Sequence, residues 1–402
     1  MKADQIPQFG VMQGVKVLSS GAGYAGPFAA TLMGEQGADV ISLEPPNRPE
    51  NSRSDDLAWA VEHRNQRAMT LDIPSAEGRE VFKRLIRWAD ILIESSKGGT
   101  FAKWGLTDEV LWSYNPKLVI VHVSGYGQAG VSEYVTRPGY DGIAQAFSGY
   151  MHWNGEDDGE PLRTKPYAAD FVPPLHAAFI AVAALRRAEQ TGVGESIDLA
   201  QFETMVRIQY SYLVNALNGG RVFTRTGNRE STMSVYGLFR CADGGHIIAM
   251  IAGRPMWAKA LPLLGLSDDP DFAEVRVSFL PGTPQARKAD AAVTELCSKH
   301  SALEVEKMFN AAGVSCSRVF SPEEMESDPH YQLRETLRLW TDPDTGKEIK
   351  VPNIVPPMAV NPTQIWRGGP AFNADTDDIL DELGYSGTER KALYSAGACK
   401  QP

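Results

Sequence analysis

The chain has 402 residues, of which 43% are hydrophobic, so it is long enough for two or three domains that each bury a core. It contains no run of about eighteen uncharged apolar residues, and its first residues, MKADQIPQFG, lack the apolar stretch of a secretory signal. The formal net charge of −11 opposes a general attraction to nucleic acid or anionic lipid. These features predict a cytoplasmic globular protein with neither a nucleic-acid partner nor a membrane partner.

Cysteine and histidine show none of the patterns that mark a metal site. The four cysteines are widely scattered, and the seven histidines have neither metal-ligand spacing nor a charge-relay pattern. A G-x-S-x-G nucleophile elbow is also missing from the sequence. We therefore expect reduced thiols and no bound metal, and the hydrolase classes lose support.

Short β-branched runs alternate with helical patterns from Lys16 to about Ala200. The runs are VKVLS, ADVISLE, AMTLDI, DILIE and LVIVHVS, with helices expected from about Pro27, after Ser75 and after Thr107. This alternation predicts an α/β domain with a parallel sheet covered by helices on both faces. A further helix, from about Pro173 to Gly192, is expected to pack against the sheet. Its residues at helical spacing are Leu175, Ala178, Phe179, Val182 and Leu185.

The composition turns polar and glycine-rich between about Asn218 and Ser234, as is typical of a linker. Beyond it, YGLFRCADGGHIIAMI predicts a hairpin that turns at Asp243-Gly244-Gly245. The C-terminal part has no obvious core of its own and is expected to return to the first domain. The expected organisation is a large α/β domain over residues 1–222, completed by 331–402, and a small domain with linkers over 223–330.

The stretch VLSSGAGYAGP spells G-x-G-x-x-G from Gly21 to Gly26, directly after the first expected strand. With Glu44 at the end of the next strand, it matches the fingerprint of a dinucleotide-binding loop. Pro27 favours the first helical position, so the helix is expected to begin after the motif, with Gly26 in the loop and not in helix–strand packing. Three interpretations stay open: a dinucleotide site, a tight turn, and a close approach of backbone to another ligand.

Two cationic clusters lie where loops leave the expected sheet, which is the usual ligand-binding edge. Arg64 and Arg67 precede the strand AMTLDI, and Lys97 and Lys103 follow the strand DILIE. Together these side chains could hold phosphates. A solvated charged surface is the alternative for each of them.

Asp170, in RTKPYAADFVPP, is the carboxylate that stands out. It precedes the expected helix start, where unpaired N–H groups and the helix dipole keep a carboxylate ionised even beside phosphates. That position suits a nucleophile, and it equally suits a capping residue.

The chain resembles the class III CoA-transferases of the formyl-CoA transferase type, and within them the carnitine CoA-transferases. The likeness runs nearly end to end, through AGPFAATLMGEQGADVI, RNQRAMTLDI, IESSKGGTFAKWGLTDEVLW, NPKLVIVHVSGYGQ, YDGIAQAFSGY, KPYAADF, TGVGESIDLAQFE, YGLFRCADG and NPTQIWRGGP. The segments IESSKG, AQAFSGY and QIWRG favour the carnitine branch. That branch exchanges CoA between a betainyl-CoA thioester, such as crotonobetainyl-CoA or γ-butyrobetainyl-CoA, and carnitine.

The resemblance implies a large Rossmann-like domain, a smaller α+β domain and an interlocked, ring-like homodimer. It implies CoA thioesters and small carboxylates as substrates, with no permanently bound cofactor. Asp170 matches the catalytic aspartate, which would form aspartyl anhydride and aspartyl-CoA thioester intermediates. The loop positions and the resemblance together place these residues near CoA: Ala22, Gly23, Tyr24, Arg64, Leu71, Lys97, Lys103, Tyr140 and Asp141.

Departures from the family patterns bear on the substrate. Lys103-Trp104 stands where the carnitine branch has two arginines, and Pro45 stands where oxalate-type members carry an arginine. The second domain also lacks a run of four glycines, which further weakens an oxalate or formate assignment. Tyr140 replaces the histidine of the related racemases, so a two-base proton exchange lacks one partner.

Aromatic faces usually hold a quaternary ammonium such as that of carnitine. The candidates are Trp59, Tyr126, Tyr140, Trp153 and Tyr236, and core packing is the alternative for each. Four other functions stay open: a transferase for another small carboxylate, an acyl-CoA racemase, a non-catalytic CoA-binding subunit and a nicotinamide oxidoreductase.

Overall fold

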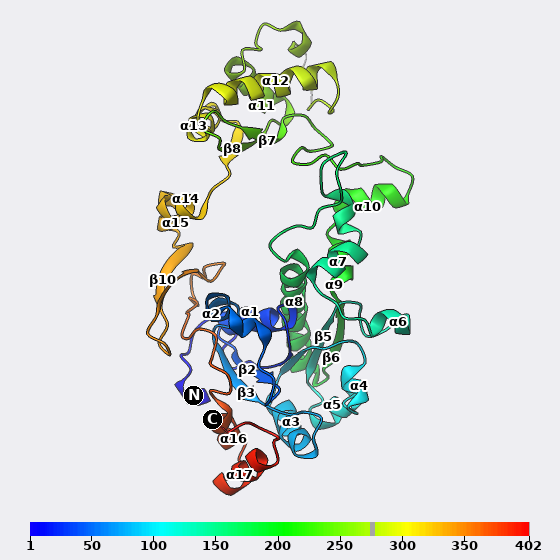
Figure 1. Cartoon of the computed structure of the whole chain (residues 1–402), viewed down its shortest axis with the longest axis vertical. Helices are drawn as coiled ribbons and strands as arrows, with labels where there is room; N and C mark the ends of the chain where they lie inside the picture. The colour runs from blue at the N-terminus through cyan, green and yellow to red at the C-terminus, as the bar shows by residue number, and fades with distance from the viewer. Residues whose placement is uncertain (274–277, 402) are drawn as a thin grey trace. The chain divides into compact units, whose positions relative to one another are not determined.

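The computed structural model describes residues 1–273 and 278–401, which form two compact units (Figure 1). The first unit comprises Met1–Tyr150, Thr164–Gln209 and Leu333–Pro402, and the second comprises Met151–Arg163 and Tyr210–Gln332. The boundary drawn from the sequence at residue 222 therefore lies within the second unit. Met151–Arg163, placed by sequence in the large domain, also belongs to the second unit.

A six-stranded parallel sheet forms the centre of the first unit, which confirms the predicted α/β class. Its order is β3-β2-β1-β4-β5-β6, so the strand order reverses between β1 and β4. Ligands of such sheets bind at the carboxyl ends of the strands beside this reversal. The strands are β1 (Lys16–Gly21), β2 (Asp39–Glu44), β3 (Gln66–Thr70), β4 (Ile91–Ser95), β5 (Val119–Ser124) and β6 (Glu195–Ala200).

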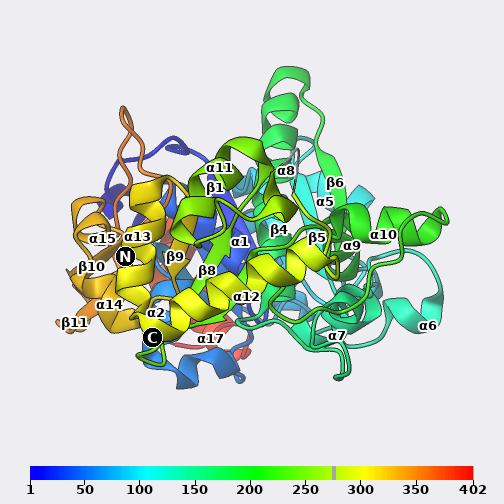
Figure 2. The same cartoon turned by 90° about the horizontal axis from the view of Figure 1, so that it is seen from above.

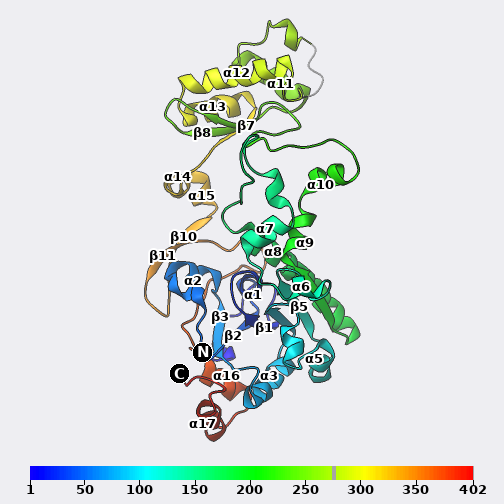
Figure 3. The ribbon, with the colours of Figure 1, turned by 45° about the vertical axis from the view of Figure 1, so that its right-hand side comes forward.

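Helices cover both faces of this sheet (Figure 3). One face packs against α3 (Ala76–Trp88), α5 (Asp108–Tyr114), α16 (Thr376–Glu382) and α17 (Gly387–Ser395). The other face packs against α1 (Ala25–Glu35) and α8 (Ala168–Thr191). The remaining helical segments are η1 (Ala3–Gln5), η2 (Asn51–Ser54), α2 (Asp56–Glu62), α4 (Thr100–Lys103), α6 (Ser132–Val135), α7 (Asp141–Phe147) and α9 (Gln201–Arg207).

Local sequence signals explain where these helices begin. The Ser75 hydroxyl accepts a hydrogen bond from the Gly78 N–H at 3.0 Å and caps α3, as predicted. Thr107 occupies the corresponding position before α5, but its side chain makes no capping bond.

Helix α8 packs on the sheet with a face other than the expected one. Its buried face consists of small residues, Ala177, Ala181 and Ala188, together with Leu185. Three larger residues predicted on that face are exposed, namely Leu175 (54%), Phe179 (74%) and Val182 (42%). Alanines let the helix approach the sheet closely, so the larger apolar side chains lie on the opposite face. Among the described residues, α8 is the one helix long and apolar enough to cross a membrane, a test that core helices also pass.

The second unit contains an antiparallel sheet in the order β7-β8-β9, with strands Tyr236–Arg240, His246–Met250 and Ser315–Arg318. The predicted hairpin at Asp243-Gly244-Gly245 joins β7 to β8. The helices α11 (Gly253–Leu263), α12 (Pro284–Lys299) and α13 (Ala302–Ala312) pack with these strands around Trp257 and Phe309 (Figure 2). The other segments are α10 (Tyr210–Leu217), η4 (Pro270–Phe272) and α14 (Pro322–Ser327); η3 (Tyr150–Trp153) and α15 (Pro329–Leu333) lie across unit boundaries.

The segment after Leu333 forms the hairpin β10 (Leu337–Thr341) and β11 (Glu348–Pro352) and then covers the outer edge of the sheet. Asp375 accepts a hydrogen bond from the Ala68 N–H at 2.8 Å, and Thr376 accepts one from the Thr70 N–H at 3.0 Å. These contacts satisfy the free edge of β3, which would otherwise offer unpaired N–H groups to another strand.

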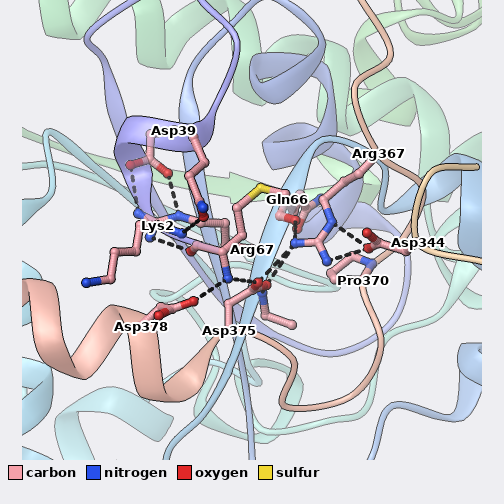
Figure 4. A network of polar contacts seen from close by, with 12 residues as sticks. Lys2, Asp39, Gln66, Arg67, Asp344, Arg367, Pro370, Asp375 and Asp378 are labelled. Carbon is pink, nitrogen blue, oxygen red and sulfur yellow. Dashed lines mark hydrogen bonds and ion pairs between the residues drawn. The ribbon is translucent and has the colours of Figure 1, made fainter.

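Ion pairs made by two buried arginines fix this return of the chain (Figure 4). The Arg67 side chain on β3 is fully buried and pairs with Asp39 at 2.8 Å and with Glu382 of α16 at 2.9 Å. Arg367 pairs in the same region with Asp375 at 2.9 Å and with Asp344 at 2.6 Å. The network therefore joins the C-terminal segment to β2 and β3.

Replacing Arg67 by Met should lower the free energy of unfolding by about 3–5 kcal/mol, because Asp39 and Glu382 lose their buried partner. Urea unfolding monitored by circular dichroism measures this change. Arg137→Met is the matched control, since Arg137 pairs with Glu133 at an exposed site and should contribute little. Equal effects of the two substitutions would contradict the structural role of the network.

Candidate active site

The glycine loop contacts the end of β4, beside the reversal of strand order. Helix α1 begins at Ala25, so the prediction that it starts after the motif is wrong. Pro27 fits in the first turn, where the lost N–H has no helical partner. A Cβ atom at Gly21 or Gly26 would overlap the side chain of Ser95. Gly26 therefore does serve helix–strand packing.

The middle of the glycine loop, residues 22–24, is more accessible than its C-terminal end. Gly23 has φ +85°, and a Cβ there would meet no other described atom within 4 Å. Ala22 is exposed, and its carbonyl accepts a hydrogen bond from the Ser95 hydroxyl at 3.3 Å. Tyr24 is half-buried, and its ring stacks on that of Tyr167 with centroids 5.8 Å apart. The loop thus presents an accessible turn at the carboxyl edge of the sheet.

Asp170 lies in the first turn of α8, which begins at Ala168 and not at the predicted Pro173. Because Pro173 has no N–H, the Ala169 carbonyl lacks its usual helical donor. The Gln201 amide of α9 supplies a donor, at 2.8 Å from that carbonyl and 2.7 Å from Asp170 Oδ1. The Ala169 N–H donates in turn to Asp141 Oδ1 at 2.8 Å. Residues from α7 and α9 therefore fix the turn that carries Asp170.

The Asp170 carboxylate is poorly solvated. Burial, with a smaller contribution from the nearby Asp141 carboxylate, raises the pKa of Asp170 to about 6, while the Gln201 hydrogen bond opposes the shift. With this pKa the group is still mostly ionised at neutral pH. A desolvated carboxylate with such a pKa is suited to nucleophilic attack.

Aromatic side chains that sequence analysis missed flank Asp170. Tyr167 and Phe171 stand on either side of it in the chain, and the Phe171 ring lies 6.1 Å from Tyr24 and 4.8 Å from Phe28. The signal was present in the segment YAADF, which carries an aromatic residue at each end. The glycine loop and the start of α8 therefore meet through aromatic contacts.

Lys97 and Lys103 are both exposed in the segment that follows β4. The loop around Lys97 is held at both ends: the Ser96 N–H donates to Glu94 Oε2 at 2.9 Å, and the Gly99 N–H donates to Gln128 Oε1 at 3.0 Å. Both lysines follow β4, the strand that neighbours the glycine loop, and their exposed charges are available to an anionic ligand.

Two other predicted CoA contacts are buried. Arg64 is 4% exposed, donates to Glu35 Oε1 at 2.7 Å and donates to the Pro352 carbonyl at 2.8 Å. The interpretation of Arg64 and Arg67 as a phosphate-binding cluster is therefore wrong, because both guanidinium groups are engaged in buried ion pairs. The Leu71 side chain is also buried, and its N–H donates to the Glu44 carbonyl at 2.8 Å.

The remaining candidates divide by exposure. Tyr140 is 70% exposed and open to a ligand, whereas Asp141 is buried and anchors Ala169.

The other aromatic candidates for a trimethylammonium site already pack against side chains or lie in the second unit. The Trp59 ring is stacked on His63 at 3.6 Å and covered by the Arg53 guanidinium at 3.9 Å. Tyr126 packs on Phe147 at 5.0 Å within an aromatic cluster. Trp153 and Tyr236 belong to the second unit.

The four cysteines are free, and burial raises the pKa values of Cys297, Cys316 and Cys399 to about 12. Within residues 1–273 and 278–401, no group of three or more His, Cys, Asp or Glu side chains is arranged to hold a metal ion.

The chain belongs to CoA-transferase family III, whose profile its sequence matches over residues 12–376. It is accordingly a transferase that uses CoA thioesters as substrates. Bile acid CoA-transferase BaiK of Clostridium scindens (strain JCM 10418 / VPI 12708) is 41% identical over 398 residues, spanning 98% of this chain and 90% of that protein.

Solved structures agree with this assignment. A CAIB/BAIF family protein from Brucella suis has a TM-score of 0.78 at 27% identity, covering 94% of this chain and all of its own. Rv3272 from Mycobacterium tuberculosis shares the fold, with a TM-score of 0.78 at 23% identity, covering 93% of this chain and all of its own.

Replacing Asp170 by Asn should stabilise the protein at pH 8 by up to roughly 3 kcal/mol, because the ionised carboxylate is costly to bury. The raised pKa favours the protonated carboxyl in the folded state, so the gain should appear as the pH rises from about 4 to 6 and stay constant above. Urea unfolding at pH 4.5 and pH 8 measures it. The exposed carboxylate of Glu80 on α3 provides the control, Glu80→Gln. A less stable Asp170→Asn protein at pH 8 would instead favour a capping role.

Proposed function

We propose that Asp170 is the nucleophile that carries CoA between an acyl-CoA thioester and a free carboxylic acid. The observation that supports this is the desolvated carboxylate, held in the first turn of α8 with a pKa of about 6. Its position beside the glycine loop lets the thioester approach from the carboxyl edge of the sheet, where Lys97 and Lys103 are exposed.

In the first half-reaction, an Asp170 oxygen attacks the thioester carbonyl carbon, the C–S bond breaks, and CoA leaves as a thiolate. The thiolate then attacks the aspartyl carbonyl of the resulting anhydride and releases the first acid, which leaves an aspartyl-CoA thioester. The acceptor carboxylate attacks this aspartyl carbonyl and displaces the thiolate. Finally, the thiolate attacks the acyl carbon of the second anhydride, which regenerates Asp170 and forms the new acyl-CoA.

Each step passes through an oxyanion that needs positioned hydrogen-bond donors. We assign this role to backbone N–H groups of the glycine loop around Ala22 and Gly23, which supplies the accessible backbone near Asp170. Exclusion of water is also required, because water would hydrolyse either activated aspartyl group.

For the acceptor we propose carnitine, with crotonobetainyl-CoA or γ-butyrobetainyl-CoA as the donor. The aromatic rings of Tyr24, Tyr167 and Phe171 beside Asp170 support this, since such rings attract a trimethylammonium group. The negative charge of Asp55 acts on Tyr24 and favours a cation there. A bile acid is the second candidate, because the relative BaiK is named for that substrate.

We further propose that the protein works as a homodimer in the cytoplasm. The exposed apolar face of α8, with Leu175, Phe179 and Val182, supports the association because a partner would remove it from water. The net charge of −11 supports the absence of nucleic-acid and anionic-membrane partners.

Covalent trapping tests the nucleophile. After the protein is mixed with crotonobetainyl-CoA and quenched with hydroxylamine, peptide mass spectrometry should find a hydroxamate at Asp170, and Asp170→Asn should show none. Carnitine, a bile acid and oxalate, added in separate samples before the quench, should differ in how fast they discharge the adduct, with carnitine fastest. Bound donor without any adduct would contradict the proposal. Deuterium entering the saturated α-carbon of γ-butyrobetainyl-CoA from solvent would then favour a racemase.

The pH dependence of the reaction provides a second test. Because protonated Asp170 cannot attack the thioester, kcat/KM for the donor should be constant above about pH 7 and fall tenfold per unit below about pH 6. Initial rates between pH 4.5 and 8 measure this profile, with CoA affinity followed in parallel to separate binding from chemistry. A rate that is unchanged between pH 5 and pH 7 would contradict the assigned pKa.

A further inference from the structure

Three polar residues lie side by side across β4, β5 and β6. In the register of the sheet, His122 on β5 is paired with Glu94 on β4 and with Asp198 on β6. Each of them is near the carboxyl end of its strand, just below the loops that face the candidate active site. Glu94 and His122 are buried, whereas Asp198 is exposed, and the neighbouring sheet positions on β4 and β5 are apolar, so this buried charged pair needs an explanation.

His122 joins two carboxylates. Its Nδ1 lies 2.7 Å from Glu94 Oε1, and its Nε2 lies 3.0 Å from Asp108 Oδ1 at the start of α5. Burial alone would lower the pKa of His122, but the hydrogen bonds to Asp108 and Glu94 raise it to about 9. At neutral pH both ring nitrogens therefore donate, and the imidazolium compensates the charge of Glu94, which is 1% exposed.

Glu94 transmits this constraint to the Lys97 loop. Its second oxygen, Oε2, accepts the Ser96 N–H at 2.9 Å. Gln128 fixes the other end of the loop. Its side-chain Oε1 accepts a hydrogen bond from the Gly99 N–H, and its backbone N–H donates to Asp198 Oδ2 at 2.8 Å. Added bulk at Gly98 would overlap Val135, so the loop has little room to shift. Residues on all three strands thus determine where the Lys97 backbone lies.

We propose that His122 is a positioning residue for CoA binding, which holds Glu94 in place and thereby fixes the loop that carries Lys97. The inference rests on the proposed function, in which Lys97 contacts CoA. His122 itself is 6% exposed and is not assigned any contact with the substrate. Loss of the imidazolium would leave Glu94 as an uncompensated buried charge, and protonation or reorientation of that carboxylate would release the Ser96 N–H.

A double-mutant cycle between His122 and Lys97 tests the proposal, with free CoA as the titrant in calorimetry on the full chain. His122→Phe and Lys97→Ala should each raise the CoA dissociation constant about tenfold. In the Lys97→Ala background, His122→Phe should change it less than twofold, because the lysine it positions is gone. The KM for the acyl-CoA donor should rise in His122→Phe while kcat stays within about twofold of wild type.

Two conservative variants separate positioning from general destabilisation. The amide of His122→Asn can replace Nδ1 and keep the bond to Glu94, whereas His122→Gln reaches toward Asp108 and loses Glu94. Both variants lose the positive charge of the imidazolium, but only the Asn variant keeps a hydrogen bond to Glu94, so we expect the Gln variant to bind CoA about tenfold more weakly than wild type and the Asn variant to lose less affinity. If His122→Phe fails to fold, the comparison of CoA affinity between the Asn and Gln variants tests the proposal instead. Equal affinities of the Asn and Gln variants would overturn the proposal.

The remaining outcomes are also distinguishable. Additive effects of His122→Phe and Lys97→Ala would show that His122 acts elsewhere, and would overturn the inference while leaving Lys97 as a CoA contact. An unchanged affinity in Lys97→Ala would overturn both the contact and the inference built on it. Covalent trapping at Asp170 is measured on the wild-type protein and is independent of the CoA affinities of the Lys97 and His122 variants. The transfer chemistry is therefore judged separately.

Discussion

The site depends on a hydrogen bond that Pro173 cannot make. Its missing N–H frees the Ala169 carbonyl, and Gln201 of α9 fills the gap while also holding Asp170. Asp141 of α7 accepts the Ala169 N–H from the other side. One turn of α8 therefore joins three helices, and hydrogen bonds to the Ala169 backbone and to the Asp170 carboxylate together fix the position of that carboxylate.

The buried charged groups have two kinds of surroundings. Arg67 and His122 are each placed between two carboxylates, which stabilises packing and orients the neighbouring segments. Asp170 instead receives an amide N–H and lies near another carboxylate, so its negative charge is costly. In the proposed mechanism, Asp170 loses its negative charge when it attacks the thioester, which removes this cost; a carboxylate held in an ion pair would have no such cost to lose.

The sheet, the Ser75 cap and the β7–β8 hairpin could be predicted because their signals are local. The buried face of α8 could not, because apolar residues surround that helix and only tertiary packing selects the alanines. Arg64 and Arg67 were misread because Glu35, Asp39 and Glu382 lie far from them in sequence. For Asp170, the local pattern alone favoured a capping residue over a nucleophile; the family resemblance singled it out as the nucleophile, and its raised pKa depends on burial that only the fold shows.

The way the C-terminal segment covers β3 has a consequence for synthesis of the chain. The β3 edge emerges from the ribosome long before Asp375 and Thr376, which satisfy its N–H groups. Throughout that interval the nascent first unit carries an unpaired strand edge, and Arg67 lacks Glu382. Completion of the large domain therefore waits for the C-terminal segment, and until then the growing chain exposes the edge of β3.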